Sequence, residues 1–235
     1  SFLSDYAFLQ PYETGDRIVI PVRSGVLFSI DHSEAFIFEE CNIYASSGMG
    51  FISTYGKGRH VFDRVNIIPR PGTARLLSAV ADGIHSYNSE TGPVVKDCQI
   101  ENLGDDAVAI HGFFGIAFQH PQLTKTIEVA IPSEYDYSPG MKLEMMDFRT
   151  LEWFDSARIE QVEVISGTEA VLRIEEFRTA LEAEGKRVRS FFWKSLYRIK
   201  LDKAVMLPAD AFVINEDYIS AGFRVENNHI QNIIS

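Results

Sequence analysis

The hexad FEECNI at residues 38–43 decides the fold, because three variants of it occur farther along the chain. The variants are FDRVNI (62–67), VKDCQI (95–100) and VENNHI (225–230). Each copy has an apolar residue, two mostly polar residues, a compact residue, a polar residue and an isoleucine. The compact residues are Cys41, Val65, Cys98 and Asn228. A unit that recurs in this way predicts a repeat architecture.

The spacing of the copies gives the period of the repeat. Cys41 and Val65 are 24 residues apart and Val65 and Cys98 are 33 apart, so nine residues are added once. A second apolar run follows each of the first three copies, at Phe51, Ile84 and Val108. Short β runs with a period in the twenties are typical of a solenoid whose turns bury their apolar sides on one another. We therefore expect an all-β chain with a right-handed parallel β-helix. A sandwich would explain the alternation but not the hexad.

The two cysteines are expected to be free. Cys41 and Cys98 would lie on one inward stack with Val65 between them. Because successive coils are about 4.8 Å apart, the sulfurs would be about 9–10 Å apart, beyond disulfide reach. Asn228 on the same stack is expected to form hydrogen bonds inside the helix.

The repeat stops after His111 and resumes at Val225, which divides the chain. We expect the end of a small β module at 1–34, coils at 35–113, an inserted antiparallel β-barrel-like module at 114–211 and a return to the helix at 212–235. The last hexad ends shortly before Ser235 without a following strand. An open, uncapped solenoid end is unstable, so the chain is expected to be a fragment of a longer protein.

The insert is expected to consist mainly of strands. YSPGMKLEM (137–145) resembles YETGDRIVI (12–20), since both have Tyr, two residues, Gly and an alternating run. ARIEQVEVI (157–165) and EAVLRIEEF (169–177) also alternate and predict strands. RTALEAEGKRV (178–188) predicts a short helix or helical turn.

Composition limits the class of partner. The chain has 235 residues, is 46% hydrophobic and has a net charge of -11. The negative charge argues against nucleic acid and anionic membranes as partners. No apolar run reaches the roughly 18 residues of a membrane span. A neutral ligand such as a sugar fits better, and no metal-binding or redox cysteine spacing is present.

Three carboxylates are predicted to cluster at one corner of the helix. Asp82 precedes Asp106 by 24 residues, which is one period, and Asp105 is adjacent. Like charges at close range raise the pKa of one member, so a site can hold an acid and a base together, as glycoside hydrolysis requires. Two alternatives use the same residues: aspartates that cap turns, and a calcium site.

The stretch VADGIH, followed by VKDCQIENLGDDAVAIHG, resembles the pectin-lyase-like β-helix glycosidases, which include polygalacturonases. It is more similar to the exo-acting α-1,3-galactosidases of glycoside hydrolase family 110. The likeness lies in the Asp-Gly strand, the Gly-Asp-Asp strand one coil later, the following His-Gly and the barrel insert. It covers residues 35–113 and 212–235 well and the insert loosely.

The resemblance implies inverting hydrolysis of a terminal α-galactoside, with Asp82, Asp105 and Asp106 as the catalytic acidic set and a glycan as the partner. It also implies a secreted or periplasmic protein, without cofactor or metal. The chain departs from polygalacturonases in one motif: its only Arg-Ile-Lys, at 198–200, lies in the insert, where we expect an ordinary strand. This argues against a uronate substrate, whose carboxylate needs a paired cation.

Other residues have two interpretations each. His85 and His111 would point outward, as contacts for sugar hydroxyls or as solvated side chains. Arg75, and Arg70 near it, lie in the loop RPGTARLL (70–77), where the nine added residues fall, and could reach over a cleft. Trp153 and Trp193 could stack on sugar rings, but the barrel core is the expected place for both.

Two other functions remain open. A non-catalytic glycan-binding or structural β-helix would use the acidic cluster only to cap turns. A polysaccharide lyase would need a Lys or Arg base and calcium near the cluster, and the segment 82–111 offers no such base beside the aspartates.

Overall fold

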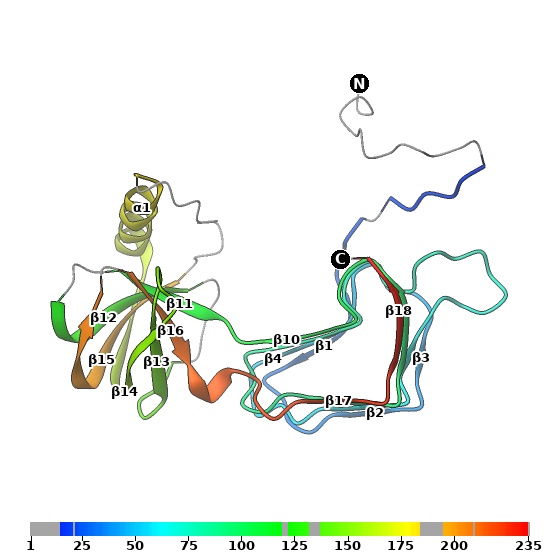
Figure 1. The fold of residues 1–235 in the computed structure, drawn as a ribbon, viewed down its shortest axis with the longest axis horizontal. Helices are drawn as coiled ribbons and strands as arrows, with labels where there is room; N and C mark the ends of the chain where they lie inside the picture. The colour runs from blue at the N-terminus through cyan, green and yellow to red at the C-terminus, as the bar shows by residue number, and fades with distance from the viewer. Residues whose placement is uncertain are drawn as a thin grey trace.

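The computed structural model describes residues 15–20, 22–118, 122–131, 137–183, 195–208 and 210–234. These residues form an all-β protein with parallel sheets and a closed barrel of six strands. Figure 1 shows the two parts side by side, with β10 leading into the barrel and the segment after β16 leading back. No helix among these residues is long and apolar enough to cross a membrane.

Three parallel sheets of four strands each make up the first part, which we call the three-sheet stack. The first sheet contains β1 (Val26–Asp31), β4 (Met49–Thr54), β7 (Ile84–Tyr87) and β10 (Val108–His111). The second contains β2 (Ile37–Glu39), β5 (Val61–Asp63), β8 (Val94–Lys96) and β17 (Arg224–Glu226). The third contains β3 (Asn42–Ile43), β6 (Asn66–Ile67), β9 (Gln99–Leu103) and β18 (His229–Ile233). The chain visits the three sheets in rotation, and the barrel is inserted between β10 and β17.

The hexad builds the corner between the second and third sheets. Its isoleucines pair in register, Ile43 with Ile67 and Ile67 with Ile100, and Ile100 also pairs with Ile230. The third residue of every copy has a positive φ, which turns the chain. These residues are Glu40 at 53°, Arg64 at 54°, Asp97 at 55° and Asn227 at 54°. The compact residue follows this turn because the chain passes close to its neighbours there.

The predicted inward stack of compact residues is confirmed. Val65 is fully buried and Cys98 nearly so, and both cysteines are free. Asn228 donates to the Val95 carbonyl over 2.9 Å and accepts from the Cys98 N–H over 2.8 Å. An asparagine can occupy this inward position because its amide meets backbone groups that would otherwise be left unpaired.

The barrel has the strand order β11-β12-β15-β14-β13-β16. Its strands are β11 (Phe114–Phe118), β12 (Gln122–Ile131), β13 (Lys142–Asp147), β14 (Trp153–Ile165), β15 (Ser195–Leu207) and β16 (Asp210–Asn215). A short 3-10 helix, η3 (Glu216–Tyr218), follows. The barrel thus ends at Asn215, beyond the predicted limit of 211, and the Arg-Ile-Lys motif lies in strand β15.

One predicted strand of the insert is wrong. EAVLRIEEF (169–177) belongs to the helix α1 (Gly167–Ala183). Ala170, Ile174 and Phe177 are the buried residues on it, and their spacing of four and three marks one helix face. Ala170 and Ile174 pack with barrel residues such as Leu196, so tertiary packing selects the helix.

Two further expectations differ from the structure or lie outside it. Trp153 is 57% exposed, so it is not part of the barrel core; Trp193 lies outside the described residues. Residues 1–14 of the predicted N-terminal module also lie outside them, and 15–20 contain no strand. Strand β1 already pairs with β4, so the stack begins at Val26, inside the segment assigned to that module.

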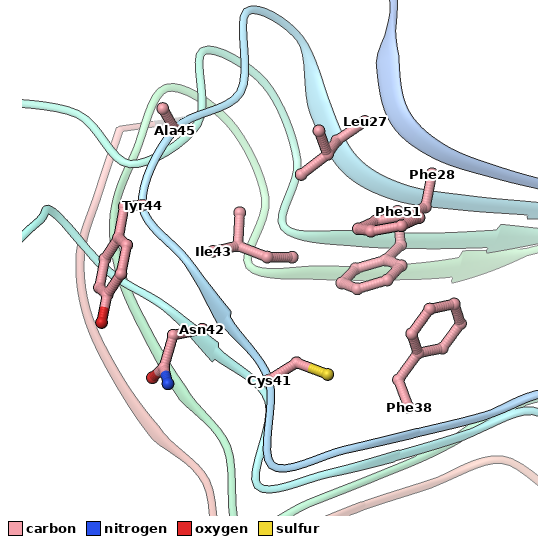
Figure 2. Close-up of a pocket in the computed structure, with 9 residues that line it drawn as sticks. All are labelled: Leu27, Phe28, Phe38, Cys41, Asn42, Ile43, Tyr44, Ala45 and Phe51. Carbon is pink, nitrogen blue, oxygen red and sulfur yellow. The ribbon is translucent and has the colours of Figure 1, made fainter.

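The first turn of the stack leaves apolar side chains open. β1, β2 and β3 are edge strands of their sheets. Figure 2 shows the rings of Phe28, Phe38 and Phe51 pointing toward one another beside Cys41 and Ile43. These side chains line a hollow of about 410 Å³. Ile37 on the same edge is 67% exposed. The hollow is the end of the stack's core and contains none of the predicted site residues.

Candidate active site

Asp82 and Asp106 are neighbours on adjacent turns of the first sheet. The register of β7 and β10 places them opposite each other, and the Gly83 N–H donates to the Asp106 carbonyl over 2.9 Å. A Cβ at Gly83 would lie 2.6 Å from the Ala107 carbonyl oxygen, so the position has no room for a side chain. The Asp-Gly pair therefore lets the chain beside Asp82 pack closely on the turn that carries Asp106.

The Asp82 side chain begins a row of hydrogen bonds that involves both predicted histidines. Asp82 is only 4% exposed, and its Oδ2 contacts Nδ1 of His85. His85 Nε2 lies 2.8 Å from His111 Nε2. His111 Nδ1 lies 3.2 Å from the Gly112 carbonyl oxygen, to which it can only donate. We call these three side chains and the Gly112 carbonyl the Asp82 row.

Aromatic rings surround the far end of the Asp82 row. Tyr87 stacks on His111 with ring centroids 5.6 Å apart, and Phe113 lies 5.2 Å from the same imidazole. Tyr55 and Phe113 also pack against the core of the barrel. The barrel therefore meets the stack at the His111 end of the row.

Burial controls the charge of these side chains. It lowers the pKa of His111, although the hydrogen bond to Gly112 opposes this, so the neutral imidazole is favoured. Burial also raises the pKa of Tyr87, and the nearby Tyr55 and Asp31 add to the effect. The Tyr87 hydroxyl is therefore neutral at physiological pH.

The other two aspartates have different surroundings. Asp105 Oδ2 lies 2.6 Å from Nη2 of Arg23, and Asp105 Oδ1 accepts from the Asp106 N–H over 3.1 Å. Asp105 thus forms an ion pair and also caps its own turn. Asp106 is exposed, so its carboxylate is accessible to solvent.

The arginines of the loop 70–77 do not join this group. Arg75 Nε donates to the Leu77 carbonyl over 2.8 Å. The Arg70 guanidinium lies over the Tyr44 ring, 5.4 Å from its centroid. The structure therefore places both in contacts near the loop rather than against Asp82, because neighbouring acceptors and rings satisfy them there.

Sequence reasoning missed the link between the histidines and the role of Arg23. His85 and His111 are 26 residues apart, which is one period plus two. Residues on one face of a strand alternate with period two, so this spacing already places them as diagonal neighbours. Arg23 has no comparable signal, because it precedes the first copy of the hexad.

The site has the components of proton-transfer chemistry. The first sheet carries all four groups at β7 and β10: one buried carboxyl (Asp82), one accessible carboxylate (Asp106) and two imidazoles (His85 and His111). Among the described residues, no group of three or more His, Cys, Asp or Glu side chains is arranged to hold a metal ion.

Comparison with known proteins gives relatives of a single kind. No family model matches the chain. It is 30% identical over 129 residues to "Alpha-1,3-galactosidase A" of Shewanella woodyi, which covers 53% of this chain and 21% of that protein. It is 26% identical over 147 residues to the protein of that name in Akkermansia muciniphila, covering 61% and 24%. The Bacteroides fragilis protein is 27% identical over 166 residues, covering 68% and 27%.

The chain thus spans about a quarter of the length of these curated relatives. The identities are low and the matches partial. The relatives named here are all called α-1,3-galactosidases, and the chain is similar to a part of each.

Proposed function

We propose that this chain carries the catalytic centre of an inverting glycoside hydrolase that removes terminal α-linked galactose from a glycan. The observation that carries the proposal is the placement of Asp82 and Asp106 on adjacent turns of one sheet. One carboxyl is buried against an imidazole and the other is exposed, so their environments differ as an acid–base pair requires. The names of the relatives support galactose as the sugar.

The proposed chemistry divides the work between two carboxyl groups. One protonates the departing glycosidic oxygen, while the other takes a proton from the water that attacks the anomeric carbon from the opposite face. Asp82 and Asp106 are the proposed pair. Asp105 completes the acidic set, held in place by Arg23.

We also propose that the three-sheet stack is a right-handed parallel β-helix of the pectin-lyase-like type, as in glycoside hydrolase family 110. The rotation of the chain through three parallel sheets supports this assignment. On the same resemblance we propose a secreted or periplasmic location, which fractionation of the source cells would test.

The direct test is activity of the full-length protein on a panel of nitrophenyl glycosides. The α-galactoside is expected to be cleaved and the β-galactoside is not. Proton NMR of the first-formed sugar should show the inverted anomer. Release of the retained anomer would contradict the proposed mechanism, and cleavage of a different sugar would contradict the substrate.

Variants test the acidic set. Asp82→Asn, Asp105→Asn and Asp106→Asn should each lower kcat by about 10²-fold or more, since general acid–base catalysis contributes about 10²–10⁴-fold. Asp97→Asn is the matched control: Asp97 is exposed at a different corner with a φ of 55°, which asparagine also adopts readily. Full activity in the three site variants would end the assignment.

One observation favours a second function, a non-catalytic glycan-binding β-helix. Asp105 already has an ion pair and a turn-capping hydrogen bond. If the acidic set is structural, the same variants should keep their ligand affinity but melt at lower temperature. Isothermal titration with α-galactosides distinguishes the two functions.

A further inference from the structure

We propose that His85 and His111 are positioning residues that hold one exchangeable proton against the Asp82 carboxyl. The catalytic use of that proton rests on the proposed function, whereas its presence follows from the geometry of the Asp82 row alone.

The contacts of the Asp82 row need more hydrogens than a carboxylate and two neutral histidines possess. Three contacts connect Asp82, His85, His111 and the Gly112 carbonyl, and each needs one hydrogen. Two neutral imidazoles bring one N–H each, and a carboxylate brings none. The third hydrogen is therefore one proton more than a carboxylate and two neutral histidines possess. Without it, two lone pairs would face each other at one of the contacts.

The end of the row fixes the direction of the bonds. The Gly112 carbonyl can only accept, so the Nδ1 of His111 carries a hydrogen. Burial favours a neutral His111, whose Nε2 then accepts from the Nε2–H of His85. The extra proton is left between Asp82 and the Nδ1 of His85, at a side chain that is almost fully buried.

The groups around the row do not supply this proton in another way. On the neighbouring strands, Tyr87 faces both imidazoles, and Tyr55 on the adjoining turn packs on Tyr87 with ring centroids 6.2 Å apart. Asp31 accepts a hydrogen bond from Thr54 over 2.5 Å, and His32 stacks on Tyr55. Asp105 and Asp106 are ionisable groups on the turn beside Asp82; Asp105 pairs with Arg23, and Asp106 is exposed.

The first test needs no substrate. Nitrogen-15 NMR of the histidine side chains in the full-length protein should show His111 with its hydrogen on Nδ1 and an unprotonated, accepting Nε2. His85 should carry a hydrogen on Nε2, and the third hydrogen should be found on its Nδ1 or, by the carbon-13 shift, on the Asp82 carboxyl. An ionised Asp82 facing an unprotonated Nδ1 of His85, or a His111 with its hydrogen on Nε2 alone, would overturn the proposal, whatever the enzyme activity.

The second test removes the acceptor while keeping the ring. In His111→Phe only the contact between Asp82 and His85 remains. A neutral His85 with its hydrogen on Nδ1 can supply the hydrogen of that contact, so no extra proton is needed. The pH limb of kcat/KM that disappears in Asp82→Asn should then move to lower pH. His111→Gln has a side-chain oxygen that can accept from His85, so its pH limb should lie closer to that of the wild type than the limb of His111→Phe does. His229→Phe, the same change at an exposed histidine of β18, should leave the limb in place.

A uniform loss of rate with an unmoved pH limb would show a merely structural role and would overturn the proposal. If the wild-type protein cleaves no glycoside, the proposed function fails, and the NMR result still decides whether the row holds its proton. If His111→Phe does not fold, the wild-type tautomers and His111→Gln decide it.

Discussion

The three-sheet stack and the barrel both bury carboxylates, and the partners of Asp82 in the stack differ from those of Glu128 in the barrel. In the stack, Asp82 is 4% exposed and faces the imidazole of His85. In the barrel, Glu128 is 6% exposed, and each of its oxygens meets a guanidinium. Arg173 Nη2 lies 2.5 Å from Oε2, and Arg198 Nη2 lies 3.0 Å from Oε1.

The difference separates a structural carboxylate from a reactive one. Arginine stays charged at every physiological pH, so the counter-charges of Glu128 do not change with pH. Histidine gains and loses its proton near neutrality. The partners of Asp82 are therefore the kind that suit acid–base work, whereas the partners of Glu128 hold β12, β15 and α1 together.

Replacing each carboxylate by its amide should destabilise the barrel but not the stack, and this is the largest effect we expect. Glu128→Gln turns one acceptor oxygen into a donor that faces a guanidinium. The free energy of unfolding should fall by about 1–3 kcal/mol, the cost of an unmet buried group. In Asp82→Asn the amide N–H can supply the third hydrogen of the Asp82 row, so stability should stay within about 0.5 kcal/mol.

Urea denaturation monitored by tryptophan fluorescence and circular dichroism measures both variants. The matched control is Glu163→Gln, since Glu163 pairs with the same Arg198 but is exposed. Equal losses in Glu128→Gln and Asp82→Asn would erase the distinction between the two carboxylates.

The stack could be predicted from the sequence to a greater extent than the barrel. Its strands recur with a period, so the positions of Cys41, Val65 and Cys98, and the pairing of Asp82 with Asp106, followed from counting residues. The barrel has no repeat, and its strands are matched by antiparallel pairing between distant segments. The first part of helix α1 was missed because Ala170 and Ile174 show their helical spacing only when the buried face is known, whereas residues 178–183 at its end lie in the segment that was predicted as a short helix.

The contacts of the site itself were less predictable. The period places Asp82 beside Asp106, but it does not say that Asp105 meets Arg23 or that Arg75 bonds to a carbonyl two residues away. Such contacts depend on where flexible side chains find the nearest acceptor. A one-dimensional repeat carries no information about that choice.

An intermediate effect should come from pH, and it concerns the stack. Burial lowers the pKa of His60 as well as that of His111. The unfolded chain therefore takes up protons first as the pH falls below about 6.5. This contribution to stability is complete above that pH and is lost as the pH falls through it. His60 Nδ1 accepts from the Phe36 N–H over 3.2 Å, and protonation would remove that acceptor.

His60→Asn keeps an oxygen that can accept from Phe36 but cannot be protonated. We therefore expect the variant to lose less stability than the wild type between about pH 7.5 and 5.5. Urea midpoints at the two pH values measure it, and His229→Asn at an exposed position is the control. An unchanged pH slope in His60→Asn would mean that His60 is not neutral in the folded stack.

The smallest effect should come from the ion pairs of Arg64 in the stack, which contrast with the buried pairs of the barrel. The Arg64 side chain is 44% exposed and contacts the exposed Glu39 and Glu40 and the buried Asp63, which keeps a second partner in Lys96. Arg64 also has a φ of 54°, at the corner where the fourth hexad has Asn227. In Arg64→Asn the loss of ion pairs opposes the gain from a residue that adopts this conformation readily.

At low salt the urea midpoint of Arg64→Asn should change little from that of the wild type. In about 1 M salt, where charges are screened beyond about 3 Å, the wild-type pairs weaken and the variant should become the more stable protein. A variant that is less stable than the wild type at both salt concentrations would show that these exposed pairs hold the corner as firmly as the arginines hold Glu128.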